Sequence, residues 1–468
     1  MENSAVAPSR VSLYDYQEND VSTIIHRLEH AGAGFKLLYQ LPTGGGKTII
    51  FSEITRRFTE QFGRKVLVLT HRNELSRQTS GTLKRSGIPN KIINSALSRI
   101  PRTNSYWCYV ALVETLKNRI RDRKFFTGDV GLVIIDEAHN NSFRKLLSSF
   151  ENAFVLGVTA TPFSSDRTLP LNKTYDELIT GRPICDLIAD GFLAKAKTIS
   201  HRVELDSLKT GSHGDYTVSS SDMLYSSAAM QELLLSLYKS RSEGKKTLIF
   251  NNGIATSKKV LELFETNGYA IRHLDNRTPP MEREAILKWF KLTKGAILTS
   301  VSILTTGFDE PTVQTVILNR ATTSISLYFQ MIGRGSRMLP RKKTFTIVDL
   351  GNNTERFGAW EKTVDWQLVF ERPDTFFETT TAAAHVNSHS MNSELRARFP
   401  NTLETGFDFD KAFQEANEQG RKHKTVINAS VRQHVLMCLE NSSTAEEAIE
   451  LAEALEPEIV YRLLLIPS

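Results

Sequence analysis

The sequence predicts an α/β protein built from two parallel-sheet units in tandem, followed by a small helical appendage. Three observations lead to this fold class. Short apolar runs rich in β-forming residues alternate with segments of helical pattern, this alternation occurs in two separate series, and a purely helical pattern returns near the C-terminus. Because parallel strands are joined by right-handed crossovers of helix length, the alternation predicts sheets with helices on both faces.

Ten apolar runs are the expected strands, five in each unit. In the first unit they lie at residues 36–41, 65–70, 106–112, 132–138 and 154–160, and in the second at 246–252, 270–275, 295–301, 315–320 and 345–350. Polar or amphipathic segments separate the runs, such as Ser257–Asn267 and Met281–Lys291 in the second unit. The runs therefore predict strands, and the segments between them predict helices.

Changes in composition set the expected domain boundaries. A stretch rich in Ser, Gly and Thr at residues 206–227 predicts a loop or a connection between the two units. Near the C-terminus, Ser443 and Glu446 have the spacing of a helix-capping box. The helical region there carries no chemical motif, and we expect it to offer a surface to a protein partner. The expected parts are a first unit at 1–205, a second unit at 206–372, a linker at 373–407 and a helical region at 408–468.

Overall composition narrows the class of protein. The formal charge of +6 and the pI near 9.0 suit a polyanionic partner, although charge of this size over 468 residues is also common in proteins that bind none. Three widely spaced cysteines support neither a disulfide framework nor a zinc site. No apolar run approaches the roughly twenty residues of a membrane span, and no leader pattern begins the chain. We therefore expect a cytoplasmic protein.

A glycine-rich stretch, QLPTGGGKT at residues 40–48, is the first candidate site. It follows an expected strand and precedes an expected helix, as the phosphate loop G-x-x-x-x-G-K-[ST] does, but Leu41 replaces the first glycine. In this hypothesis backbone amides cradle a polyphosphate, Lys47 neutralises its charge and the Thr48 hydroxyl binds Mg²⁺. The alternative is a flexible turn with an incidental lysine. The expected nucleotide-binding residues here are Thr43, Gly44, Gly45, Gly46, Lys47 and Thr48.

A pair of acids, Asp136 and Glu137, follows the apolar run LVII at the end where ligands bind in open α/β sheets. Asp136 can hold Mg²⁺, and Glu137 can take the proton from an attacking water. The alternative, a solvated strand end, is less suited to two adjacent acids downstream of a phosphate loop. The pair therefore favours phosphoryl transfer from ATP.

With DEAH at residues 136–139 in view, the chain resembles the superfamily 2 helicases and translocases. The resemblance covers roughly residues 11 to 370 and rests on motifs in the family's order. It implies two RecA-like domains that bind ATP between them. In this family the first glycine of the phosphate loop is commonly absent, so the resemblance also accounts for Leu41.

The resemblance assigns further residues of the first unit. LYDYQ at residues 13–17 is similar to the adenine-recognition element, with Gln17 as the base-pairing amide. THRNEL after the second strand resembles a nucleic-acid contact through Thr70 and Arg72, and ALVETL places Thr115 at a second such contact. TATP at residues 159–162 resembles the motif that couples the ATP site to strand separation.

The second unit supplies two more motifs of the resemblance. In LTTGFD, Thr305 and Thr306 correspond to a nucleic-acid contact, while Gly307 and Asp309 face the nucleotide.

QMIGRGSR at residues 330–337 matches the family's Q-x-x-G-R-x-x-R, with Gln330, Arg334 and Arg337 at the named positions. Two arginines three apart lie on one face of a helix, and planar guanidinium groups bind phosphate oxygens bidentately. The resemblance implies that they complete the ATP site when the two domains close; a basic surface helix is the alternative.

Together the motifs predict an ATP- and Mg²⁺-dependent motor that moves along nucleic acid. The spelling of the motifs is closest to the RadD-type bacterial DNA repair helicases and also similar to phage UvsW and restriction-subunit motors, which favours DNA over RNA and a role in repair or recombination. One departure is that the tail after Pro373 has a single cysteine, where RadD-type proteins carry a cysteine-rich region. An RNA helicase of the same fold, and an ATP-gated clamp or restriction motor subunit, remain open as alternatives.

Overall fold

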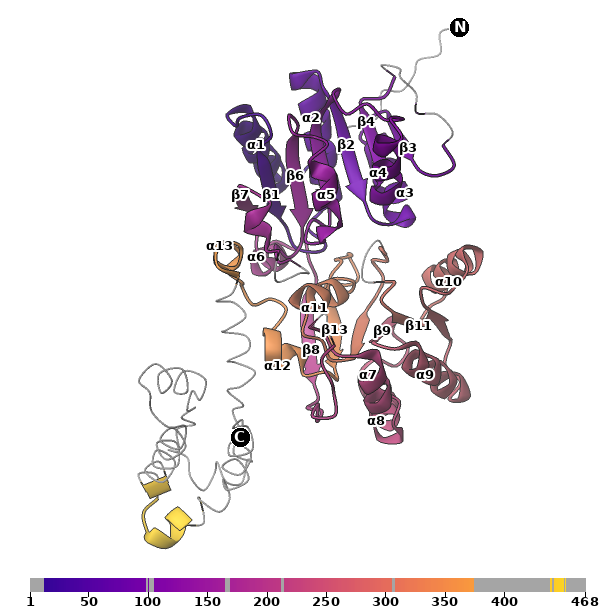
Figure 1. Cartoon of the computed structure of the whole chain (residues 1–468). Helices are drawn as coiled ribbons and strands as arrows, with labels where there is room; N and C mark the ends of the chain where they lie inside the picture. The colour runs from indigo at the N-terminus through magenta and orange to yellow at the C-terminus, as the bar shows by residue number, and fades with distance from the viewer. Residues whose placement is uncertain are drawn as a thin grey trace. The chain divides into compact units, whose positions relative to one another are not determined.

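The protein is described from a computed structural model of the chain. The described residues are 12–97, 100, 105–164, 169–211, 214–304, 308–373, 438–439, 442–449 and 451. The chain divides into two compact units, Met1–Phe376 and Phe377–Ser468, and each is considered by itself. The first unit holds two parallel sheets with their helices, which we call the first lobe and the second lobe (Figure 1).

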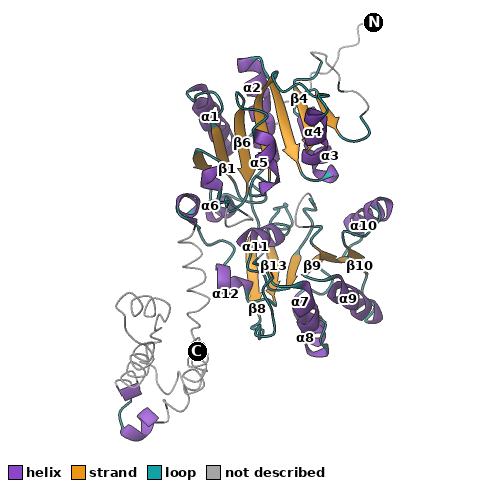
Figure 2. Cartoon of the chain, in the orientation of Figure 1, coloured by secondary structure: helices purple, strands orange, loops and turns teal. Residues whose placement is uncertain are grey.

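The first lobe is built on a sheet of order β3-β4-β2-β5-β6-β1-β7, in which every described pairing is parallel. Helices connect its strands (Figure 2). Its strands are β1 (Lys36–Gln40), β2 (Lys65–Thr70), β3 (Asn90–Ile93), β4 (Cys108–Leu112), β5 (Val130–Asp136), β6 (Phe154–Thr159) and β7 (Glu177–Thr180). Its helices are α1 (Asp15–Glu29), α2 (Lys47–Phe62), α3 (Asn73–Arg85), α4 (Val113–Arg121), α5 (Arg144–Leu147) and α6 (Ile184–Ala189), with 3₁₀ turns at Asn141–Phe143 and Leu171–Lys173.

The second lobe is built on a parallel sheet of order β10-β11-β9-β12-β13-β8. Its strands are β8 (Lys195–Ser200), β9 (Thr247–Asn251), β10 (Ile271–Leu274), β11 (Ile297–Val301), β12 (Thr315–Asn319) and β13 (Thr344–Asp349). Its helices are α7 (Val218–Tyr225), α8 (Ala228–Arg241), α9 (Ile254–Thr266), α10 (Pro280–Leu292), α11 (Ile325–Ile332) and α12 (Asn353–Phe357). The last helix, α13 (Trp366–Glu371), packs against β7 and the 3₁₀ turn Leu171–Lys173 of the first lobe.

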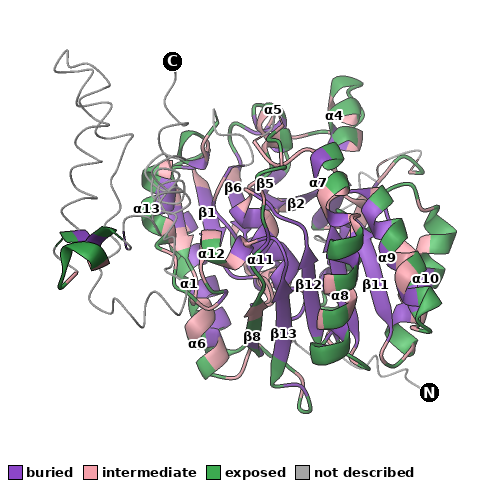
Figure 3. Ribbon diagram, turned by 90° about the horizontal axis from the view of Figure 1, so that it is seen from below, coloured by how far each residue is buried: buried purple, intermediate pink, exposed green. Residues whose placement is uncertain are grey.

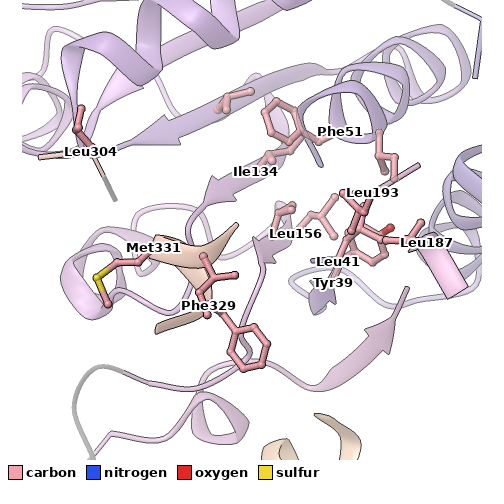
Figure 4. Close-up of a cluster of buried hydrophobic side chains, with 14 of the residues drawn as sticks. Tyr39, Leu41, Phe51, Ile134, Leu156, Leu187, Leu193, Leu304, Phe329 and Met331 are labelled. Carbon is pink, nitrogen blue, oxygen red and sulfur yellow. The ribbon is translucent and has the colours of Figure 1, made fainter. Parts of the chain in front are cut away.

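Both sheets bury their two faces, as the alternating apolar pattern predicts. In β5, for example, Leu132 and Ile134 join one hydrophobic cluster while Val133 and Ile135 join another on the opposite face. Interior strands such as β5 are accordingly buried along their length while the helices expose one side (Figure 3). One cluster contains residues of both lobes and gathers Leu41, Tyr39, Leu187 and Leu193 (Figure 4). The expected pair of parallel-sheet α/β units is therefore confirmed.

All ten apolar runs form strands, and the described residues contain three further strands that the runs do not include. These are β3, β7 and β8. The pairing of β8 with β13 places residues 195–200 in the second sheet, ahead of the boundary expected at 205/206. The chain therefore enters the second lobe earlier than its composition suggests.

The segment 206–227 differs from the loop that its composition predicts. It contains α7, whose N-terminus is capped by the Thr217 hydroxyl accepting from the amide of Ser220. Ser and Thr are unfavourable inside helices but favourable at their N-caps, so a Ser- and Thr-rich stretch can begin a helix as well as form a loop. The segment follows β8, so it is part of the second lobe and not a connection between the lobes.

In the C-terminal unit, Phe377–Ser468, the described helical residues are 438–439, 445–449 and 451. The helix at 445–449 is capped one position later than expected: the Thr444 hydroxyl accepts from the Glu447 amide, and the Glu447 carboxylate accepts from the amide of Ser443, the residue before the cap. Thr444 lies three residues before Glu447, as Ser443 lies three before Glu446, so both fit the spacing, and in the structure Thr444 is the cap. The expected linker at 373–407, apart from residue 373, and most of the helical region lie outside the described residues.

Within the described part of the chain, no helix is both long and apolar enough to cross a bilayer. The cytoplasmic location expected from the sequence stays a prediction.

Candidate ATP site between the two lobes

The glycine-rich loop connects β1 to α2, where the sequence predicts it. Gly44 and Gly46 have φ angles of 98° and 91°, in the left-handed region that residues with a Cβ rarely adopt. Leu41, which replaces the first glycine of the phosphate-loop pattern, is fully buried, and a Cβ on Gly45 would lie 2.8 Å from its Cγ. Leu41 therefore packs beneath the loop, and glycine at position 45 leaves room for it.

Lys47 begins α2, and its ammonium lies among acceptors and acids. Its Nζ donates to the carbonyl of Leu41 at 3.1 Å and to that of Pro42 at 3.4 Å. Burial lowers the pKa of Lys47, while the charges of Glu137 and Asp136 oppose that shift. The loop thus brings one cation to the helix N-terminus, where backbone amides also favour an anion.

Gln17 contacts the loop from α1. Its Nε2 donates to the Gly45 carbonyl at 3.3 Å, and the Tyr16 hydroxyl donates to the same carbonyl at 2.7 Å. The Gln17 Oε1 accepts from the Tyr14 amide at 3.1 Å. The Gln17 amide therefore positions the phosphate loop, and its expected contact with an adenine edge stays a prediction.

Substituting Gly46 by alanine should weaken ATP binding about tenfold or more, roughly 1.4 kcal/mol. A Cβ at this position would lie 2.5 Å from Gln17 Nε2 and would sit on a left-handed backbone. Gly63 at the other end of α2 is a matched control, because it also has positive φ but a Cβ there would meet nothing within 4 Å. Both variants should lose about 1 kcal/mol of stability, but Gly63→Ala should bind a fluorescent ATP analogue normally. Equal loss of binding in both variants would contradict a role for the Gln17 contact.

Asp136 and Glu137 lie together at the carboxyl end of β5. Asp136 is buried, and its Oδ1 accepts from the Glu137 amide at 3.1 Å. Glu137 itself has a φ of 55°, an uncommon conformation for a residue with a side chain. Burial, and next the charge of Glu137, raise the pKa of Asp136, while Lys47 opposes the shift. A pKa shifted by burial and a neighbouring like charge is typical of functional sites.

His139 links the acidic pair to the second lobe. Its Nδ1 lies 3.5 Å from Glu137 Oε2 and 3.1 Å from Thr159 Oγ1, and its Nε2 lies 3.3 Å from Gln330 Nε2. Burial lowers the pKa of His139, which favours the neutral ring. A neutral ring that carries its proton on Nδ1 can donate to Thr159 and accept from the Gln330 amide.

A second polar contact joins the lobes nearby: the Thr161 hydroxyl donates to Ser326 Oγ at 2.7 Å. Thr159 accepts from the Thr161 amide at 3.2 Å, so the TATP turn connects this contact to His139. Sequence reasoning assigned no role to His139 or to Ser326. His139 belongs to the DEAH motif and could have been found there, whereas Ser326 has no local signal.

The two arginines of the second lobe do not lie on a helix, contrary to the expectation. The helix α11 ends at Ile332. In the turn that follows, the amides of residues 334–336 each donate a hydrogen bond to the carbonyl three residues earlier. A Cβ on Gly333 would lie 2.6 Å from Thr43 Cβ, and a Cβ on Gly335 would lie 2.4 Å from Phe345. These close approaches stop the helix, so tight packing and not helical periodicity sets the direction of the arginines.

Arg337 lies against the phosphate loop of the first lobe. Its Nη1 is 3.2 Å from the position of a Cβ built on Gly44, and its Nε donates to Asp309 Oδ1 at 2.9 Å. Ser336 approaches the same loop, with its Oγ 3.5 Å from the Thr43 carbonyl. The structure therefore brings Thr43, Gly44, Asp309 and Arg337 together, as the resemblance implies.

Arg334 lies deeper in the site and donates to the Phe308 carbonyl. Burial lowers the pKa of Arg334 to about 10, so the guanidinium keeps its charge at neutral pH, and the charge of Glu137 favours that form. A permanent cation near the proposed base is suited to a phosphoryl group in transfer.

The residues expected to contact nucleic acid fall into different environments. Thr70 is fully buried and its hydroxyl shares a 2.6 Å hydrogen bond with Ser76, and its expected contact with a phosphate stays a prediction. Arg72 donates to the carbonyls of Ile303 at 3.0 Å and Ser302 at 3.4 Å in the second lobe. Thr115 is half-buried in the first turn of α4. Thr305, Thr306 and Gly307 lie outside the described residues.

The donors near the loop fit Mg²⁺ bound together with a nucleotide. Proteins hold Mg²⁺ with one or two carboxylates plus phosphate oxygens and water. Asp136 offers a buried carboxylate beside Lys47, and Thr48 is the second residue of α2. Among the described residues no cluster of three or more His, Cys, Asp or Glu could hold a metal by itself. A site that needs phosphate oxygens to complete it agrees with that finding.

Comparisons with known proteins agree with this site. The family described as type III restriction enzyme, res subunit, matches residues 10–164, and the helicase conserved C-terminal domain matches residues 227–338. A protein of Saccharomyces cerevisiae named as ATP-dependent helicase IRC3 is 31% identical over 363 residues, covering 72% of this chain and 51% of that protein. A 51.5 kDa protein of a Lactococcus phage is 29% identical, covering 71% of this chain and 70% of that protein. The chain thus spans about half the length of IRC3.

Solved structures show the same fold. The fragment of an HsdR subunit of a type I restriction enzyme from Vibrio vulnificus YJ016 aligns with a TM-score of 0.58 and 23% identity, over 74% of this chain and 65% of that chain. Dbp5 of S. cerevisiae, in a structure with RNA and ADP BeF3, aligns with a TM-score of 0.51 and 16% identity, over 80% of this chain and 97% of that chain. With helicase families matching both lobes and a relative named as a helicase, the chain belongs to the superfamily 2 helicases.

Proposed function

We propose that this protein is an ATP-driven motor that moves along nucleic acid, with DNA as its preferred track. The observation that supports this most is the approach of Arg337 to Gly44, because it brings a second-lobe arginine beside the loop that we propose holds the phosphates. An ATP site completed by two lobes makes hydrolysis depend on their relative position.

In the proposed chemistry the protein groups divide the work. Amides of residues 44–48 and the Lys47 ammonium hold the phosphates, and Arg334 and Arg337 stabilise charge on the group in transfer. Glu137 accepts the proton of the attacking water at its carboxylate, next to His139. Mg²⁺, when bound through Thr48 and Asp136, would neutralise phosphate charge.

Movement follows if the lobes grip the polymer differently in their ATP-bound and ATP-free states. Arg72 supports this proposal because it meets the second lobe through backbone carbonyls of residues 302 and 303, next to the motif expected to touch the track. A motor that holds backbone phosphates should be largely indifferent to base identity and sensitive to salt.

DNA is favoured over RNA by the relatives and not by the fold. The relatives include the EcoAI endonuclease subunit of a type I restriction enzyme, 25% identical over 70% of this chain and 46% of that protein. LlaBIII, a restriction-modification enzyme of the same fold, was solved bound to DNA, whereas Dbp5 was solved with RNA. These names also support a second candidate, in which the chain is the motor subunit of a larger assembly. The RadD-type resemblance and a repair role stay predictions.

The test is the ATPase rate of the purified chain without nucleic acid and with single-stranded DNA, duplex DNA or RNA. DNA should stimulate hydrolysis more than RNA of equal length, and the stimulation should fall as salt rises. If RNA alone stimulates hydrolysis, RNA and not DNA is the track. If no polymer stimulates hydrolysis, the proposal of a motor is refuted. Strand displacement on forked DNA by the chain alone separates a helicase from a motor subunit that needs partners.

A further inference from the structure

Residues 214–216, just before α7, bind the segment that follows β12 in the second lobe, and we call them the clasp. Most of its hydrogen bonds are made by the Asp215 carboxylate. The Oδ2 accepts from Arg320 Nη2 at 3.1 Å and from the Thr322 hydroxyl at 2.9 Å, and the Oδ1 accepts from the Thr323 amide at 2.9 Å. The Tyr216 amide donates to the same Oδ1 at 2.9 Å. One carboxylate thus fixes three of the four residues from 320 to 323.

Arg320 explains why an acid is needed at this place. It is only 4% exposed, and Asp215 is the carboxylate with which it forms an ion pair. A buried guanidinium without a partner is strongly unfavourable, so the pair fixes the clasp to the end of β12. Thr323 adds a further contact by donating from its hydroxyl to the Gly214 carbonyl at 2.6 Å.

Asn353 holds the backbone of the same segment through its side-chain amide. Its Oδ1 accepts from the Thr322 amide at 2.9 Å, and its Nδ2 donates to the Arg320 carbonyl at 2.8 Å. Asn353 is fully buried, and a Cβ on Gly351 would lie 2.0 Å from the Arg320 carbonyl oxygen. Residues 320–323 are therefore held by two side chains, Asp215 and Asn353, and removing the bonds of one leaves the segment free to shift.

The held segment leads directly into α11. The Thr322 hydroxyl accepts from the Ser324 amide at 3.1 Å, and the Ser324 hydroxyl caps the helix by accepting from the Leu327 amide at 3.2 Å. The same Thr322 hydroxyl donates to Asp215, so one oxygen atom bonds both to the clasp and to the capping residue Ser324. The helix then carries Ser326 and Gln330 to the first lobe and ends at the turn with the two arginines. A shift at its start is carried to these groups because a short helix moves as a rigid body.

We propose that Asp215 is a positioning residue for ATP hydrolysis, which sets the start of α11 and through it the placement of Gln330, Arg334 and Arg337 against the phosphate loop. The proposal rests on the proposed function. Nucleotide binding by the first lobe should not depend on Asp215, because the loop and Lys47 lie in the other sheet. A displacement of about 1 Å in a catalytic group can cost about a hundredfold in rate.

The test compares Asp215→Asn with Asp206→Asn, an exposed acid of the same segment, in the full chain. Asp215→Asn should lower kcat for ATP about 10- to 100-fold, with the Kd of a fluorescent ATP analogue within twofold of wild type. Asp206→Asn should match wild type. In the Arg337→Ala background, Asp215→Asn should cause a smaller loss than in wild type, because one of the groups that Asp215 positions is already absent. Hydrogen exchange should quicken in residues 325–337 and stay unchanged in the phosphate loop.

Two results would overturn the proposal: a kcat within threefold of wild type, or losses that multiply in the double variant. If Asp215→Asn lowers the melting temperature so far that it does not fold, Thr323→Val decides by the same criteria. This variant removes the hydroxyl bonds to the Gly214 carbonyl and to Asp215 Oδ1 and keeps the bond from the Thr323 amide. Absence of nucleic-acid-stimulated hydrolysis in wild type would refute the proposed function, and the exchange measurement would still report whether Asp215 positions the turn.

Discussion

Arg337→Ala should reduce ATP hydrolysis about 10³-fold or more, the range found for arginines that stabilise phosphoryl transfer. The Arg337 guanidinium adjoins the phosphate loop of the other lobe, and its Nε donates a hydrogen bond to Asp309 Oδ1. Arg334→Ala should have a comparable effect, since its buried cation lies near Glu137. Both variants should still bind ATP, because the loop, Lys47 and the acids belong to the first lobe.

The measurement is steady-state ATPase activity with saturating nucleic acid, alongside equilibrium binding of an ATP analogue. Arg341→Ala is the matched control, because it removes an exposed arginine a few residues beyond the same turn. It should leave hydrolysis unchanged. Hydrolysis that persists in the double variant of Arg334 and Arg337 would refute a catalytic role for the second lobe.

Glu137→Gln should abolish turnover while ATP and nucleic acid stay bound. General-base catalysis contributes about 10²- to 10⁴-fold, and glutamine cannot accept the proton of the attacking water. Lys47 and Asp136 are unchanged in this variant, so the phosphates and the metal keep their ligands. Lys47→Ala should also abolish turnover, but through loss of the charge that holds the phosphates.

Single-turnover hydrolysis and ATP binding measured on the same samples separate the two variants. Glu137→Gln should bind ATP within a few-fold of wild type, and its ATP-bound form should retain nucleic acid. Loss of ATP binding in Glu137→Gln would contradict its assignment as the base and would favour a role in holding the loop.

The strands that sequence patterns miss share one physical property. β3, β7 and β8 all lie at edges of their sheets. An edge strand has one neighbour and is partly exposed, so it does not need a continuous apolar run. β8, which reads KAKTIS, buries only Ala196 among its six residues. Interior strands such as β5 are buried throughout, and these were predictable because burial on both faces demands apolar side chains.

The candidate site was predictable where chemistry depends on local order along the chain. The loop at Gly44–Thr48 and the acids after β5 follow from strand-to-helix and strand-end patterns. The course of the chain at Arg334 was not predictable, because contacts of Gly333 and Gly335 with distant residues end the helix. Asp215 gave no signal either, since its partners lie more than a hundred residues away.

The place of β8 has a consequence for biosynthesis. Lys195 pairs with Thr344, so this strand leaves the ribosome roughly 150 residues before its partner exists. At about 5 to 20 residues per second the wait is on the order of 7 to 30 s. During that time the backbone amides and carbonyls of β8 that will pair with β13 are open to water and to other nascent chains. Two polar side chains on each face, two lysines on one and a threonine and a serine on the other, suit such a delay because a polar strand resists premature association.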